Sequence, residues 1–116
     1  GHAVGFDPLQ PDYISAIEQT DSYITEIMQA VHDRETTLNE KWLIVVCTDH
    51  GGSGTGHGGQ DGVPQTRYVF LILNGEAIPN TNQQGNAANT DVFPTVMKFL
   101  DIPIQHTWDL DGKALY

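Results

Sequence analysis

The sequence is poor in cysteine and in basic residues, and both shortages exclude functions. Cys47 is the only cysteine among 116 residues, so no disulfide can form within the chain. It ends an apolar run, which predicts a buried and unreactive thiol. Five Lys and Arg residues stand against 15 Asp and Glu residues, and the net charge is −10. Because general nucleic-acid binding depends on neutralising phosphates with basic side chains, we expect no nucleic-acid-binding surface.

Long apolar runs and a leader segment are also missing from the printed sequence. No apolar stretch approaches the roughly 18 residues that a membrane-crossing helix needs, so we expect no membrane span. The opening Gly-His-Ala-Val-Gly-Phe is not a basic and apolar signal segment. Because the sequence does not begin with Met, we expect a processed or trimmed chain, which leaves an upstream secretion signal open.

Two segments of the chain predict amphipathic helices. Apolar residues recur at helical spacing from about Pro11 to Arg34, with acidic residues between them. A second helix is predicted from Thr90 to Leu100, with Asn89 or Thr90 as its cap. Residues 76–89 are rich in Asn, Gln, Gly and Pro, and residues 102–116 follow no regular pattern. We therefore expect a surface loop before the second helix and an irregular tail after it.

Two further segments predict β-strands. Residues 41–47 form a continuous apolar, β-branched run without alternation, which is typical of a strand buried on both faces of a parallel sheet. Residues 67–73 are the other candidate strand. A two-stranded sheet is marginal alone, and a buried parallel strand needs neighbours on both sides. We therefore expect this α/β chain to pair with another chain or to be one piece of a larger domain.

The segment after the first predicted strand contains the residues best suited to chemistry. Glycine makes up more than half of residues 51–62, so no regular element can persist there. Asp49 and His50 lie at the carboxyl end of the strand, where α/β sheets bind ligands, and His57 follows shortly afterwards. Carboxylate and imidazole groups are both zinc ligands, which predicts a metal site. The alternative is a strand-end Asp that caps a turn beside two solvated histidines.

Two nucleotide-binding motifs compete for the same segment. Residues 54–59 formally match the dinucleotide motif GxGxxG. That motif must open a helix, but Gln-Asp-Gly-Val-Pro follows it and disfavours one, and Asp49 and His50 would be left unexplained. A P-loop is excluded, because no Lys-Ser or Lys-Thr closes the glycine run. Metal binding is therefore the leading interpretation.

Three histidines lie outside this segment. His2 stands shortly before the predicted long helix and is a candidate fourth ligand, although Gly-His at a chain start is also typical of an expression-vector remnant. His32 lies near the end of that helix, where a cation favours the helix dipole, so we expect a surface position. His106 has no partner pattern, and we expect a structural role for it.

Together these segments resemble the C-terminal portion of an alkaline phosphatase superfamily enzyme, above all of the type I phosphodiesterase and nucleotide pyrophosphatase branch. The resemblance covers nearly the whole chain and is carried by short motifs. They are Gly-His-x-x-Gly-Phe at 1–6, Thr-Asp-His-Gly-Gly at 48–52, Gly-His-Gly-Gly at 56–59, Asp-Val-Phe-Pro-Thr-Val at 91–96 and Asp-Gly-Lys-Ala-Leu at 111–115. The resemblance implies a three-layer α/β/α fold with a mostly parallel sheet, of which residues 1–116 form the C-terminal portion.

The resemblance also implies a zinc-dependent hydrolase of phosphate monoesters or diesters. In that family two zinc ions lie side by side. By resemblance, Asp49 and His50 hold the ion that also binds the nucleophile, while His2 and His57 hold the other together with an Asp from an Asp-x-x-Gly-His motif. That Asp would lie ahead of the first residue of this chain.

The family's nucleophile, a Thr or Ser at a helix start, would lie upstream as well. None of the hydroxyl residues near the predicted ligands (Thr48, Ser53 and Thr55) matches its motif. The resemblance therefore implies no catalytic residue in this chain and no activity of the chain alone. The implied partners are a small phosphate-ester substrate and the rest of the same domain, in the periplasm or outside the cell.

Three alternatives remain open at this point. Sulfatases share the superfamily fold and a similar ending, but they use a modified Cys in a Cys-x-Pro-x-Arg setting that Cys47 does not match. A phosphosugar mutase uses the same pair of ions to move a phosphoryl group within its substrate. A non-catalytic metal-binding or interaction module, from a different functional class, would need no nucleophile.

Overall fold

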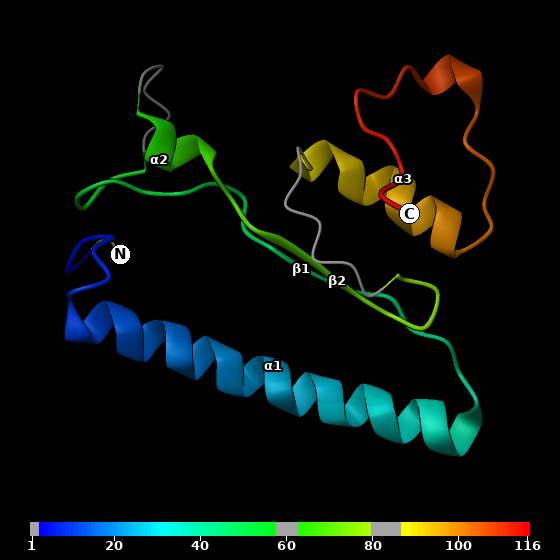
Figure 1. The fold of residues 1–116 in the computed structure, drawn as a ribbon, viewed down its shortest axis with the longest axis horizontal. Coiled ribbons are helices and arrows are strands. Elements are labelled where there is room, and N and C mark those ends of the chain that lie inside the picture. The colour runs from blue at the N-terminus through cyan, green and yellow to red at the C-terminus, as the bar shows by residue number, and fades with distance from the viewer. Residues whose placement is uncertain (1–2, 58–62, 80–86) are drawn as a thin grey trace. The chain divides into compact units, whose positions relative to one another are not determined.

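The computed structural model describes residues 3–57, 63–79 and 87–116 (Figure 1). The chain divides into two compact units. The first contains Gly1–Glu40 and Thr48–Val69, and the second contains Lys41–Cys47 and Phe70–Tyr116. Within the described ranges, no helix is both long enough and apolar enough to cross a membrane. The predicted ligand His2 lies outside the residues that the structure describes.

The first unit begins with a long helix, α1, which spans Pro11–Leu38 and confirms the first predicted helix. Pro11 stands in its first turn, where a missing N–H costs no hydrogen bond. The helix continues beyond the predicted end at Arg34 because polar residues alone do not terminate a helix. It ends at Asn39, whose φ of 53° is left-handed, a conformation that Asn tolerates better than most residues.

The apolar stripe of α1 is covered only in part by the described residues. Val31 is buried, and Ile24 and Met28 are half-buried. In contrast, Ile17 and Ile27 are 50% and 58% exposed. An amphipathic helix of this length gains most of its stability from packing its apolar face, and the described residues leave part of that face uncovered.

The second unit contains a two-stranded sheet. Strand β1 (Ile44–Cys47) pairs with β2 (Leu71–Asn74). β1 lies within the predicted strand 41–47, and β2 overlaps the predicted strand 67–73 and extends one residue beyond it. The pairing is antiparallel, with Ile44 opposite Asn74 and Cys47 opposite Leu71. A parallel pair would need a crossover, usually a long helix, whereas the described residues between these strands form only a one-turn helix. The predicted parallel sheet is therefore not formed between these two strands.

The burial of β1 also differs from the prediction. Residues 44–46 are half-buried, and Cys47 is exposed. The expectation of a buried thiol is wrong in the described structure, because Cys47 is the last residue of β1 and the chain leaves the sheet there. The mixed helix and strand content agrees with an α/β protein. The three-layer fold and the C-terminal place of residues 1–116 in a larger domain stay predictions.

A one-turn helix, α2 (Pro64–Arg67), occupies part of the segment predicted as the second strand. Pro64 fixes the first helical φ, and the carbonyl oxygen of Val63 accepts both the N–H of Thr66 at 3.1 Å and its hydroxyl at 2.8 Å. Of the predicted strand 67–73, only Arg67 belongs to α2. Residues 68–70 belong to neither element, and β2 begins later than predicted, at Leu71.

The second predicted helix is confirmed as a 3₁₀ turn, η1 (Asn89–Asp91), that leads into α3 (Val92–Phe99). The tail after it is irregular, as predicted, apart from a short 3₁₀ turn, η2 (His106–Trp108). In η2 the ring of Trp108 lies 6.0 Å from that of Phe93, centroid to centroid.

The end of the tail is fixed to the start of α3 by four residues, Asp91, Thr95, Lys113 and Leu115, which we call the tail anchor. Asp91 is 5% exposed, and its carboxylate accepts the N–H of Lys113 at 2.8 Å and that of Ala88 at 2.9 Å. These two hydrogen bonds, from Lys113 first, lower the pKa of Asp91, and burial opposes them. The fully buried Thr95 hydroxyl donates to the Asp91 carbonyl at 2.6 Å and accepts from Leu115 N–H at 3.2 Å.

Candidate metal centre

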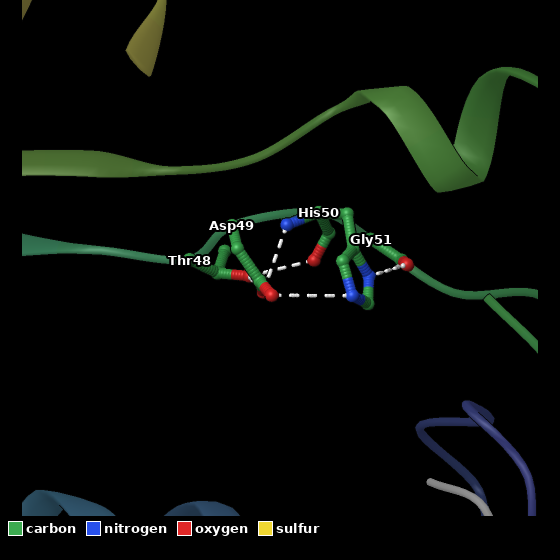
Figure 2. Close-up of polar contacts among 4 residues, drawn as sticks. All are labelled: Thr48, Asp49, His50 and Gly51. Carbon is green, nitrogen blue, oxygen red and sulfur yellow. Dashed lines mark hydrogen bonds and ion pairs between the residues drawn. The ribbon is translucent and has the colours of Figure 1, made fainter. Parts of the chain in front are cut away.

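Residues 48–57, which follow β1 and which we call the ligand loop, bring Asp49 and His50 face to face (Figure 2). Neighbouring side chains of an extended strand point to opposite sides, so this requires a turn. The Thr48 hydroxyl makes the turn by donating to the carbonyl oxygen of His50 at 2.6 Å. The backbone N–H of His50 donates to Asp49 Oδ1 at 3.0 Å. The turn thus places two adjacent residues on one side of the chain.

The contacts of the two ring nitrogens of His50 show which nitrogen faces the carboxylate. Its Nδ1 lies 2.8 Å from the carbonyl oxygen of Gly51, which can only accept, so Nδ1 carries a proton. Its Nε2 lies 3.2 Å from Asp49 Oδ2. Figure 2 shows this contact as the lower dashed line.

This spacing fits the chemistry of a zinc ligand pair. Zinc binds imidazole nitrogen and carboxylate oxygen at about 2.0–2.2 Å, so two tetrahedral ligands stand roughly 3.3 Å apart. The separation of 3.2 Å between Nε2 and Oδ2 is close to that value. The pKa of Asp49 is lowered, chiefly by the hydrogen bond from the His50 N–H, so the carboxylate is held in its charged, ligating form. The Asp49 side chain is 84% exposed and open to an incoming ion.

His57 joins this pair through ring stacking. Its ring lies nearly parallel to that of His50, with centroids 4.2 Å apart and planes 11° apart. The stacking is made possible by a tight turn in which the backbones of Ser53 and Gly56 hydrogen-bond to each other at 3.0 and 3.1 Å. In the described part of the chain, no group of three or more His, Cys, Asp or Glu side chains is arranged to hold one ion. His57 therefore stands beside the Asp49–His50 pair and does not complete a three-ligand cage with it.

The structure thus brings together three of the four predicted ligands, while His2 lies outside the described residues. Of the other histidines, His32 is exposed on α1, as predicted, and His106 is exposed in η2. Whether any of the predicted ligands binds metal stays a prediction.

Sequence reasoning missed the residues that hold the ligand loop from outside. The Phe6 ring lies against Gly52, and the carbonyl oxygen of Thr66 accepts the N–H of Gly51 at 3.0 Å. A signal was present in the sequence, since glycines at 51 and 52 directly follow the predicted ligands. The glycine content predicts only that no regular element persists there, whereas the structure shows close approach of other backbone and ring atoms to these glycines.

Comparison with known proteins supplies the family. The family model described as Sulfatase matches residues 7–102, which include the ligand loop and all of α3. No curated protein and no solved structure matches the chain. The match confirms the superfamily predicted from the motifs and implies a hydrolase, while the nucleotide pyrophosphatase branch stays a prediction. The chain belongs to the sulfatase family, which is part of the alkaline phosphatase superfamily.

Proposed function

We propose that this chain supplies part of the two-metal site of a zinc-dependent hydrolase that acts on phosphate monoesters or diesters. The observation that carries the proposal is the opposition of Asp49 Oδ2 and His50 Nε2 at 3.2 Å, with the His57 ring stacked on His50. The family match supports the hydrolase class. The identity of the metal rests on the chemistry of the residues, and that of the ester rests on the resemblance of the sequence motifs to the phosphodiesterase branch.

The donor atoms favour zinc over calcium or magnesium. Calcium and magnesium prefer oxygen ligands, whereas imidazole nitrogen is a common ligand of zinc. Two of the three residues brought together here, His50 and His57, offer imidazole. A site built for a hard cation would be expected to offer carboxylates and amides in their place.

The residues of the chain prepare this site in three ways. The hydrogen bond from His50 Nδ1 to the Gly51 carbonyl fixes the ring orientation and leaves Nε2 for the metal, as partners of ligating histidines commonly do. The lowered pKa of Asp49 keeps its carboxylate charged. Asp49 and His50 would hold one ion, and His57 would hold the second together with His2. When bound, such paired ions activate the attacking hydroxyl and stabilise charge on the leaving oxygen.

A second candidate function is hydrolysis of sulfate esters. The observation in its favour is the family description, Sulfatase, over residues 7–102. The two candidates differ in the metal that supports activity and in the ester that is cleaved, so one set of assays separates them.

The test uses the complete gene product that contains these residues. After removal of metal by a chelator, zinc, magnesium or calcium is added, and cleavage of p-nitrophenyl phosphate, bis(p-nitrophenyl) phosphate and p-nitrophenyl sulfate is followed by absorbance. The proposal expects zinc to restore cleavage of a phosphate ester. Activity on the sulfate alone, supported by calcium or magnesium, would establish the second candidate, and inactivity with every metal would refute both.

Ligand assignment has its own test and a matched control. Replacing Asp49 or His57 with Ala should sharply reduce the zinc that the protein retains, because each removal takes away a ligand atom. The His32→Ala variant removes an exposed histidine of α1 and should leave the zinc content unchanged. Unchanged zinc content in the Asp49 and His57 variants would refute the assignment.

A further inference from the structure

The ligand loop is held in place by the segment that precedes α1. We propose that Gly5, Phe6, Gly52 and Gly54, which we call the clasp, position the ligand loop for metal binding, with Phe6 as the positioning side chain. The inference rests on the proposed function, because it assigns a role toward the same metal site. None of these four residues offers a metal ligand itself.

The clasp joins the two segments by backbone and ring contacts. The N–H of Phe6 donates to the carbonyl oxygen of Gly54 at 2.8 Å. Gly5 adopts a φ of +93°, which favours glycine, and a Cβ built on it would lie 3.3 Å from that same carbonyl oxygen. A Cβ built on Gly52 would lie only 2.4 Å from carbons of the Phe6 ring. Glycine at position 52 therefore allows the ring to lie directly against the loop backbone.

The Phe6 ring is supported from α1. It makes an edge-to-face contact with Tyr13, with centroids 6.0 Å apart and planes at 70°. Tyr13 lies in the first turn of α1 and is half-buried. The ligand loop is thereby connected, through one aromatic ring, to the longest helix of its unit. A loop fixed in this way is more rigid than its glycine content suggests.

The clasp acts on the loop between the two histidines. Gly52 and Gly54 lie between His50 and His57 in the sequence, and Ser53 begins the turn that returns His57 to His50. Loss of the Phe6 contact would free this turn and with it the position of His57. Residues that orient metal ligands from outside typically change metal affinity by about 10–100-fold when they are replaced.

The experiment compares a glycine of the clasp with an exposed residue of the same unit. Gly52→Ala places a methyl group against the Phe6 ring, whereas Ser15→Ala changes an exposed side chain of α1. Zinc affinity of the complete gene product is measured by competition with a chromophoric chelator, and thermal unfolding of the metal-free protein shows whether each variant is folded. We expect at least about tenfold weaker zinc binding for Gly52→Ala and no change for Ser15→Ala.

A second pair of variants covers the case in which Gly52→Ala does not fold. Phe6→Ala removes the ring and should weaken zinc binding by a similar factor, while Phe6→Tyr keeps the ring and should restore most of the affinity. A folded Phe6→Ala protein with the affinity of the parent would overturn the clasp, even if Asp49→Ala abolishes zinc binding. If the parent binds no zinc, the proposed function fails, and the role of the clasp toward metal fails with it.

Discussion

Replacing Asp91 with Asn should destabilise the second unit by about 2 kcal/mol, because the carboxylate is the centre of the tail anchor. Both carboxylate oxygens accept a backbone N–H, from Lys113 at 2.8 Å and from Ala88 at 2.9 Å, and the residue is 5% exposed. Asn keeps one acceptor and turns an NH₂ group toward the other backbone N–H. A buried donor left without a partner costs about 1–3 kcal/mol.

The effect can be measured by urea unfolding and by hydrogen exchange of the complete gene product. The unfolding midpoint should fall, and the amides of Ala88 and Lys113 should lose protection, because these are the N–H groups that Asp91 accepts. Asp109→Asn is the matched control, since Asp109 is an exposed residue of the same tail. If Asp91→Asn behaves like Asp109→Asn in both measurements, the assignment of the tail anchor is refuted.

Three further predictions concern the tail anchor and the end of α1. The pKa of Asp91 is lowered in the folded protein, so the ionised carboxylate contributes fully to stability above its unfolded pKa of about 3.9. This contribution is lost as pH falls through the folded pKa. The difference in urea midpoint between the parent and Asp91→Asn should therefore shrink below about pH 4. Gly112→Ala should lower the urea midpoint by the equivalent of about 1–3 kcal/mol, because its Cβ would lie 2.0 Å from the carbonyl oxygen of Thr90. Glu40→Gln should lower the urea midpoint less, and only at low salt, because the Arg34 and Glu40 side chains of this ion pair are 52% and 33% exposed. An equal loss at low and high salt would contradict this.

Much of the fold follows from local signals in the sequence. The apolar spacing after Pro11 predicts α1, and the pattern before Leu100 predicts α3, since each depends on the periodicity of its own residues. Strand partners depend on distant residues, and for that reason the direction of pairing between β1 and β2 was not predictable from either segment. The end of α1 depends on the backbone conformation of Asn39, which periodicity does not report.

The candidate site was predictable in composition but not in its arrangement. Asp49 and His50 are adjacent, so their association needs only the turn closed by Thr48. The stacking of His57 on His50 depends on a second turn, and the contact of Phe6 with Gly52 joins segments that are far apart in the sequence. Spacing alone suggests which residues can bind metal, whereas such contacts decide where they lie.

The adjacency of Asp49 and His50 has a consequence for how metal would be linked to folding. Two neighbouring residues stay close together in an unfolded chain, so the proposed zinc pair would retain part of its affinity before the protein folds. A ligand stabilises the folded state only by the difference between its affinities for the folded and unfolded forms. In the proposed two-metal site, zinc-linked stabilisation should therefore come mainly from the second ion, because His57 is brought to its place only after the turn at Ser53 and Gly56 has formed.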